Sequence, residues 1–237
     1  MAKAQNVKYN KEILEMVKNL TPINNSVVIE KDVSTSKSIV INATNPTTTI
    51  AYKFLAPVDS FAFDGEEIAF YDFSEFFQLF SYFKNPELQQ NTNQLLISSG
   101  KSKINYLLSD TEVIKKGPKK VAFSNPDVSF QITSEDVTEL EKIINLINAE
   151  NVNISVKGNK ATFKLYNSAH ENSFQKEFKI ENASQSTIDL NFSSEVFALL
   201  PKESYKLEIK KEGIMKISLE GKSDISLELY VAEVEEE

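Results

Sequence analysis

The sequence holds few of the residue types that catalysis or metal binding needs. It has a single histidine, His170, no cysteine and only six glycines. One imidazole cannot build a histidine-rich metal site, and a Ser-His-Asp triad would depend on His170, which we expect to lie in a loop. The sequence contains no glycine-rich loop that could bind phosphates. The acidic residues Asp59, Asp64, Glu66 and Glu67 are expected to be solvated rather than to form a metal cluster. The sequence therefore predicts a protein that is not an enzyme and that uses no cofactor and no metal.

The remaining ionisable residues are almost all lysines and carboxylates. The 26 basic residues are all lysine, and the 34 acidic residues bring the net charge to −8. Such a charge argues against a protein that coats nucleic acid over its whole surface, but it allows a local basic surface. Lysines present mobile point charges, whereas arginine supplies the rigid fork that reads bases. A biased genome composition accounts for the missing arginine at least as well as a functional reason does.

Targeting signals are missing from the sequence. No apolar run approaches the roughly 20 residues that a spanning helix needs, and residues 1–9 lack the apolar region of a signal peptide. The absence of cysteine agrees with a reducing compartment. We therefore expect a cytoplasmic protein that does not bind membranes.

Apolar residues recur at helical spacing in two segments of the first half. Residues 10–21 predict a helix with Asn10 as its N-cap, and residues 73–83 predict a helix with a stripe of phenylalanines on its core face. Alternating apolar residues and turn signals predict strands in the rest of this half. These strands are expected at residues 26–30, 38–42, 48–54, 67–71, 87–90, 94–98 and 102–109.

The second half repeats the order of the first. A helix capped by Ser134 and a short helix at residues 194–200 occupy corresponding places. Two pairs of segments match in pattern and lie at nearly the same offset, namely 11–20 with 137–146 and 68–79 with 188–199. The strands of this half are expected at residues 152–156, 161–166, 174–180, 187–192, 205–210, 214–219 and 225–231. The sequence thus predicts an α+β fold made of two tandem copies of one unit.

A connector separates the two copies. Residues 111–125 contain Lys-Lys-Gly-Pro-Lys-Lys, which is typical of a linker. We predict a first domain at residues 1–110, a connector at 111–125 and a second domain at 126–237.

Two tandem helix-and-sheet units joined by one connector, in a chain of 237 residues, resemble the sliding clamps of DNA replication. The likeness is strongest to the clamps of T-even-type tailed phages. It is carried by residues 11–20 with the following 21–26, and by Phe61-Ala62-Phe63 leading through residues 68–73. Proliferating cell nuclear antigen (PCNA) is the more distant relative. The resemblance implies two clamp domains, each with antiparallel sheets and helices on one face, that assemble into a ring.

The resemblance also implies a function. A homotrimeric ring would encircle double-stranded DNA without sequence preference, be loaded by a clamp loader and tether the replicative DNA polymerase for processive synthesis. In this family the helices line the channel. In the present sequence acidic residues share the helices with the lysines, as they do on an ordinary solvated face. The resemblance implies that the following lysines contact DNA: Lys8, Lys11, Lys18, Lys84, Lys142 and Lys202.

Two further sets of residues follow from the resemblance. Chains would pair through the edge strands 104–108 and 174–180, whose contact residues are Ile104, Tyr106, Leu108, Phe174 and Phe178. The polymerase and other clients would dock a short hydrophobic peptide beside the connector. That site would use Val113, Ile114, Val121 and Phe123, although these four could equally pin the connector to the sheets.

A different class of function stays open. The chain could be a duplicated, β-rich structural or adaptor protein, for example a virion component, without a DNA role. A lysine-lined inner surface in a trimer would distinguish a clamp from such a protein.

Overall fold

The computed structural model describes residues 5–34, 36–169, 171–183 and 187–234, so His170 lies outside the described residues. The chain forms two compact units. The first consists of residues 1–46 and 52–119, and the second consists of residues 47–51 and 120–237. The chain passes from one unit to the other at Lys119 and Lys120, inside the range that the sequence assigns to the connector.

The first unit carries two sheets. One has the strand order β5-β1-β7-β8-β9, and the other has the order β4-β3-β2-β6. Two 3-10 turns, at Val58–Ser60 and Thr111–Val113, accompany them. The elements are β1 (Gln5–Tyr9), α1 (Lys11–Asn19), β2 (Val27–Lys31), β3 (Ser38–Thr44), β4 (Ile50–Pro57), β5 (Phe61–Ala62), β6 (Glu67–Phe70), α2 (Phe73–Tyr82), β7 (Glu87–Asn91), β8 (Gln94–Ser99) and β9 (Ser102–Leu107).

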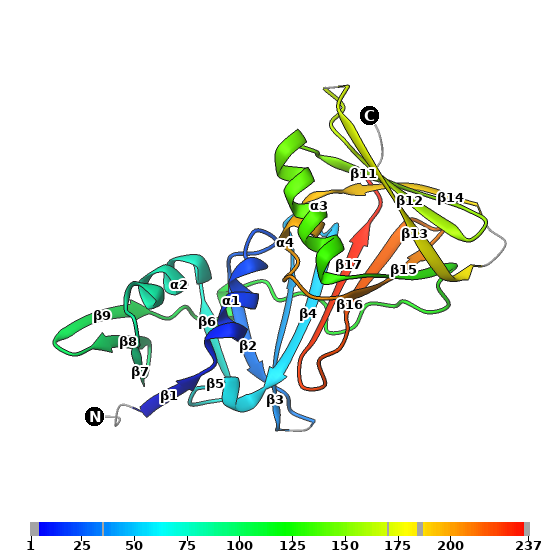
Figure 1. Ribbon diagram of the computed structural model, residues 1–237. Coiled ribbons are helices and arrows are strands. Elements are labelled where there is room, and N and C mark those ends of the chain that lie inside the picture. The colour runs from blue at the N-terminus through cyan, green and yellow to red at the C-terminus, as the bar shows by residue number, and fades with distance from the viewer. Residues whose placement is uncertain (1–4, 35, 170, 184–186, 235–237) are drawn as a thin grey trace. The chain divides into compact units, whose positions relative to one another are not determined.

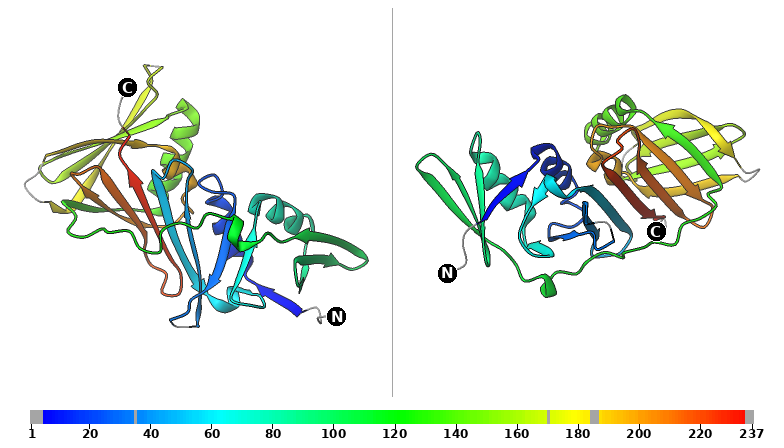
Figure 2. Two further views of the ribbon diagram at one scale, coloured as in Figure 1. Left: turned by 180° about the vertical axis from the view of Figure 1, so that it is seen from behind. Right: turned by 90° about the horizontal axis from the view of Figure 1, so that it is seen from below.

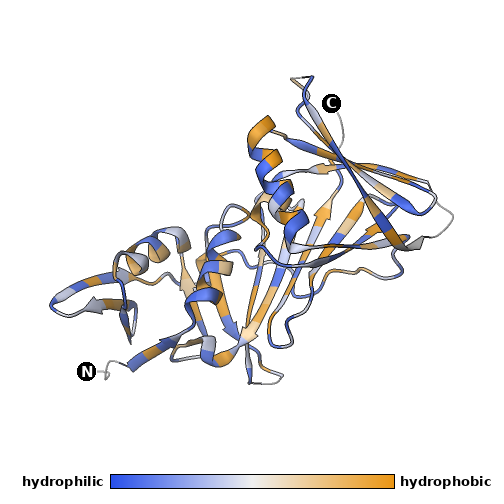
Figure 3. Cartoon of the chain, viewed as in Figure 1, coloured by the Kyte–Doolittle hydropathy of each residue, from blue (hydrophilic) through white to orange (hydrophobic). Residues whose placement is uncertain are grey.

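Both helices of the first unit are capped and amphipathic. The Asn10 side chain accepts a hydrogen bond from the backbone N–H of Glu12 at 3.0 Å, as predicted for the N-cap of α1. Asp72 caps α2 in the same way, accepting from the backbone N–H of Glu75 at 2.7 Å. The predicted phenylalanine stripe is core at Phe73, Phe76 and Phe80, which are all buried. The polar residues Glu15 and Lys18 of α1 and Glu75 and Gln78 of α2 are exposed to solvent. Hydrophilic residues of α1 appear as blue segments in Figure 3.

The second unit repeats the element order helix, four strands, helix, three strands, with a leading strand before it. Its strands follow the order β14-β11-β12-β13-β10-β15-β16-β17, and every pairing that has been assigned among them is antiparallel. The elements are β10 (Val128–Ile132), α3 (Ser134–Ile147), β11 (Asn151–Lys157), β12 (Lys160–Tyr166), β13 (Ser173–Ala183), β14 (Ile188–Ser193), α4 (Glu195–Leu199), β15 (Tyr205–Lys210), β16 (Ile214–Leu219) and β17 (Ser226–Ala232).

The start of α3 differs from the prediction by one residue. Thr133, not Ser134, is the N-cap: its hydroxyl accepts from the backbone N–H of Asp136 at 3.2 Å. The Asp136 carboxylate accepts in return from the Thr133 backbone N–H at 2.7 Å. This reciprocal pair is a capping box. Both residues have cap-forming side chains, and the acid three residues after Thr133 decides between them.

No helix among the described residues is long and apolar enough to span a bilayer.

Candidate functional surfaces

The lysines on and beside α1 are exposed because the opposite face of the helix is core. Ile13, Leu14, Met16 and Val17 are buried, which leaves the lysines and glutamates of the helix to solvent. Lys11 pairs with Glu15 at 3.7 Å across one helical turn, and both side chains are more than half exposed. An ion pair this exposed contributes little to stability.

Lys8 and Lys18 are exposed as well, and neither forms an ion pair among the described residues. Their charges are therefore available to an anionic partner.

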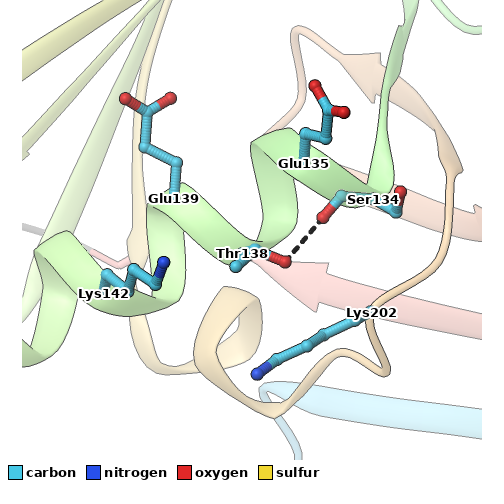
Figure 4. Close-up of a pocket in the computed structure, with 6 residues that line it drawn as sticks. All are labelled: Ser134, Glu135, Thr138, Glu139, Lys142 and Lys202. Atoms are coloured by element: carbon cyan, nitrogen blue, oxygen red, sulfur yellow. Dashed lines mark hydrogen bonds between the residues drawn. The ribbon is translucent and has the colours of Figure 1, made fainter.

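The remaining predicted lysines lie at or near the other helices. Lys84 is exposed just after α2. Lys142 on α3 and Lys202 after α4 line an open cavity of about 550 Å³ (Figure 4). The Lys202 ammonium lies 3.2 Å from the Glu141 carboxylate.

Acidic residues share this cavity and the helices as a whole. Glu135 and Glu139 line the cavity together with the two lysines (Figure 4). The helices carry lysine only at positions 11, 18 and 142. They carry acidic residues at positions 12, 15, 75, 135, 136, 139, 141 and 195. The helix surface can therefore offer individual lysine contacts to phosphates, but it does not form a continuous basic lining.

The predicted edge strands both have an unpaired side. β9 ends the order β5-β1-β7-β8-β9, and among the described residues it pairs only with β8, as its outer position in Figures 1 and 2 shows. β13 pairs with β12 along residues 173–179, whereas its pairing with β10 begins only at Ile180. Within the described residues, the other side of β13 from Ser173 to Lys179 therefore has no strand partner. Such edges are templates for pairing with a further strand.

The side chains predicted at these edges have different environments. Tyr106 is buried, its ring lies against Phe76, and its hydroxyl donates to the Asp72 carbonyl at 2.7 Å. This burial raises the pKa of Tyr106 to about 12. Phe178 is also buried, with its ring centroid 4.9 Å from that of Phe163. Both rings are core residues of their own unit, so they cannot supply new apolar burial to a contact between chains.

Other side chains at the edges are more accessible. Ile104, Leu108 and Phe174 are half-buried. Leu107 on β9 is 70% exposed, although the sequence did not single it out. The alternation of β9 is the signal that could have identified it, since neighbours of a core tyrosine on a strand point to the opposite face.

The first part of the connector is fixed to the first unit. Ile114 is buried against Val28 and Ala69. The Lys116 ammonium bridges two carboxylates, at 2.9 Å from Glu30 and 2.5 Å from Glu67. Ile114 therefore pins the connector to the sheet, which is the alternative that the sequence left open.

Two features of the following residues strengthen this attachment. The Gly117 backbone N–H donates to the Asn42 carbonyl at 2.8 Å. A Cβ at Gly117 would lie 2.6 Å from the Ala43 backbone, so only glycine permits this close approach.

The ion pairs of Lys116 have electrostatic consequences. The hydrogen bond from Lys116 lowers the pKa of Glu67 below its ordinary value. Burial alone would lower the pKa of Lys116, but its hydrogen bonds to Glu67 and Glu30 outweigh burial and raise it. Glu67 is therefore the ion-pair partner of the connector residue Lys116, and it is not a freely solvated member of the acidic loop.

The other predicted docking residues lie in different surroundings. Val113 is 70% exposed. Val121 and Phe123 are half-buried, and the Phe123 ring lies 6.1 Å from that of Tyr230 in the second unit. A cavity of about 280 Å³ lies in the first unit where the connector passes. It is lined by Glu30, Lys31, Asp32, Val33, Ser34, Val40, Asn42, Lys53 and Lys119.

Comparison with known proteins places these surfaces in context. No family model matches the chain. A curated protein named sliding clamp, from Vibrio phage KVP40, is 25% identical over 234 residues, covering 95% of this chain and 98% of the relative. The predicted resemblance to phage sliding clamps is confirmed.

Solved structures agree over nearly the whole chain. PCNA from Entamoeba histolytica matches with a TM-score of 0.74 at 13% identity, covering 99% of this chain and 100% of that one. PCNA from A. fulgidus, bound to the C-terminal region of FEN-1, matches with a TM-score of 0.73 at 13% identity and the same coverage. A PCNA2–PCNA3 complex from Sulfolobus tokodaii matches with a TM-score of 0.73 at 11% identity, covering 96% and 98%. The chain therefore has the clamp fold, as predicted.

Proposed function

We propose that this chain is the subunit of a sliding clamp, a closed ring that encircles duplex DNA and tethers a DNA polymerase. The similarity to a phage sliding clamp along 95% of the chain carries this proposal. The protein would act without catalysis of its own, by keeping the polymerase at the DNA.

Assembly would use the two unpaired sheet edges. β9 belongs to the first unit and β13 to the second, so a pairing of one with the other joins different surfaces of successive chains. Such head-to-tail contacts form a ring when the rotation closes. The resemblance implies a ring of six domains, which three chains of two domains each would supply.

DNA would be held mainly by enclosure. The lysines at positions 8, 11, 18, 84, 142 and 202 are exposed and could contact phosphates, which is a non-specific and salt-dependent interaction. The acidic residues on the same helices limit that attraction. We therefore propose that a clamp loader opens the ring and that closure, rather than affinity, retains the DNA.

Clients would dock a hydrophobic peptide near the connector. One of the matching PCNA structures binds the C-terminal region of FEN-1, which supports peptide recognition as a mode of this fold. In the present chain Val113 is an exposed large apolar residue of the connector, whereas Ile114 is buried in the core of the first unit. A titration of the polymerase's terminal peptide should therefore compare wild type with Val113→Ser, and equal affinities would move the docking site elsewhere.

Two measurements test the central proposal. Molar mass across a concentration series should reach three times 26.7 kDa. After loading, the protein should stay on closed circular DNA and slide off when the circle is cut. A trimer that is lost equally from both DNA forms would favour a structural protein without a DNA role, and a monomer at all concentrations would refute the ring.

A further inference from the structure

One cavity of the first unit has polar and charged groups in its wall that find no partner there. It is the cavity of about 280 Å³ described above, which is lined by residues of β2, β3 and β4, the turn after β2 and the connector residue Lys119. Ligand pockets in proteins usually have volumes of about 300–1,000 Å³, so this cavity suits a small ligand or a short stretch of peptide. The described residues that line it include none of those predicted to contact DNA, another subunit or a client peptide.

The first of these groups is the side-chain amide of Asn42 on β3. Asn42 is only 7% exposed, because the connector backbone lies directly on the strand: the Gly117 N–H donates to the Asn42 carbonyl at 2.8 Å. The side-chain oxygen Oδ1 is buried and accepts no hydrogen bond among the described residues. A buried acceptor without a partner costs free energy. Its presence in a cavity wall therefore indicates that a bound group supplies the missing donor.

Two lysines add positive charge to the same cavity. Lys53 of β4 and Lys119 of the connector both line it, and neither forms an ion pair among the described residues. The nearby Glu30 carboxylate does not compensate them, because it is paired with the Lys116 ammonium at 2.9 Å. The cavity therefore offers two ammonium groups to an anionic partner.

The other charged residues of the cavity wall have partners of their own. The Lys31 ammonium lies over the Phe63 ring, 5.1 Å from its centroid. The Asp32 carboxylate accepts from the Ser34 backbone N–H at 3.0 Å and from the Ser34 hydroxyl at 2.8 Å. These bonds fix the turn after β2, which places Val33, 91% exposed, at the edge of the cavity. The wall thus combines uncompensated positive charge with an exposed apolar side chain.

We propose that this cavity binds an acidic segment of a partner protein. A glutamate or aspartate carboxylate of the segment lies between Lys53 and Lys119, a backbone N–H donates to Asn42 Oδ1, and an apolar neighbour of the acid rests on Val33. The amide of an asparagine offers both donors and acceptors, as a peptide group requires, whereas sulfate has no hydrogen to donate. The inference does not rest on ring assembly, because every residue in it belongs to the first unit.

Single-stranded nucleic acid is the alternative anionic partner. Proteins bind it by combining basic residues with aromatic side chains on which the bases stack. None of the described residues that line the cavity is aromatic, and two of them, Glu30 and Asp32, are acidic. The lining therefore favours a peptide.

Titration with a defined peptide tests the site. The probe is the capped peptide Ser-Glu-Val-Glu-Val-Ser, and the matched peptide has glutamine in place of both glutamates; each is added to the ¹⁵N-labelled full chain. We expect the acidic peptide to shift the side-chain amide signals of Asn42 and the backbone signal of Val33. The glutamine peptide should bind about tenfold more weakly, because it lacks the charge-assisted hydrogen bonds. Absence of these shifts, or equal affinity of the two peptides, would overturn the proposal.

Variants of the lysines locate the contact. The chain with both Lys53→Gln and Lys119→Gln should bind the acidic peptide about fivefold more weakly or worse. The matched control carries Lys115→Gln and Lys157→Gln, which remove the same charge at exposed positions outside the cavity and should leave the affinity unchanged. Equal affinity of the two double variants for the peptide would overturn the assignment of the carboxylate to this cavity.

A variant of Asn42 separates binding from folding. Asn42→Leu should weaken peptide binding but keep the unfolding temperature, because it removes an acceptor that has no partner in the folded chain. Full peptide affinity in this variant would overturn the role of Asn42. A thymidine oligonucleotide that binds wild type at Asn42 and Val33 and resists displacement by the peptide would assign the cavity to nucleic acid instead. A chain that stays monomeric yet binds the peptide at Asn42 would refute the ring and support the present inference.

Discussion

Replacing Lys116 by glutamine should release the connector from the first unit. The variant removes both ion pairs of the ammonium, at 2.9 Å from Glu30 and 2.5 Å from Glu67, and leaves two carboxylates near each other. Charge-assisted hydrogen bonds contribute about 1.5–3 kcal/mol each. The three side chains are between 22% and 34% exposed, so solvent screening reduces the sum to about 1–2 kcal/mol.

The backbone N–H of Gly117 provides a local probe of this loss. It donates to the Asn42 carbonyl one residue after Lys116. Because 1.4 kcal/mol corresponds to a tenfold change in an equilibrium constant, its hydrogen exchange should accelerate about 5- to 30-fold in Lys116→Gln. Lys115→Gln is the matched control, since Lys115 is exposed and forms no ion pair among the described residues.

The pH dependence gives a further check on the same reasoning. The pKa of Glu67 is lowered in the folded chain, so its contribution is complete above its ordinary value of 4.5 and is lost as the pH falls through the folded pKa. The difference between wild type and Lys116→Gln should therefore shrink in acid. Equal hydrogen exchange of Gly117 in wild type and Lys116→Gln at pH 7 would show that the ion pairs of Lys116 do not hold the connector. The attachment would then be assigned to Ile114 alone.

Three other predictions concern α3 and the lysines. Thr133→Ala removes the hydroxyl that caps α3 and should cost about 1 kcal/mol in the free energy of unfolding, measured by denaturant titration; no change would refute the capping box. Burial raises the pKa of Asp136, but hydrogen bonds from Lys176 and Thr133 bring it below 3.8, so its stabilisation is complete above that pH and lost as the pH falls through the folded pKa. Asp136→Asn should therefore be destabilised at pH 7 and approach wild type in strong acid, and a constant difference across pH would contradict this. Finally, Lys18→Glu combined with Lys142→Glu should shorten retention on circular DNA without lowering the unfolding temperature, and the same pair changed to glutamine should show a smaller effect. Unchanged retention in both would remove these lysines from the DNA surface.

Periodicity was sufficient to predict much of the fold. The core faces of α1 and α2 and most strands lie within a few residues of their predicted ranges, because alternation and helical spacing report burial directly. The N-cap of α3 was wrong by one residue, since Thr133 and Ser134 are both good caps and only the reciprocal bond with Asp136 distinguishes them. The leading strand β10 was not among the predicted ranges, because it is short and follows a connector.

The side-chain environments of the candidate surfaces could not be read from the sequence. An aromatic residue on an edge strand can face the core or a partner. Alternation in β9 says that Tyr106 and Leu107 lie on opposite faces, but it does not say which face is buried. The structure decides this at the start of α2, where the carbonyl of the N-cap Asp72 accepts from the Tyr106 hydroxyl. The Lys116 bridge is similarly invisible, because its two carboxylates are 86 and 49 residues away in the chain.

The acidic character of the helices bears on how such a ring would hold DNA. A surface that combines a few lysines with more carboxylates gives phosphates little net attraction, so a protein of this kind would bind open duplex weakly. Its residence on DNA would then depend on how long the ring stays closed. That lifetime depends on the contacts between chains, which on our proposal are the backbone bonds of β9 with β13. Weakening that pairing should therefore shorten retention on circular DNA even when the lysines are unchanged. Salt should affect the two kinds of variant differently: lysine variants should lose their defect at high salt, whereas a variant weakened in the pairing of β9 with β13 should keep it.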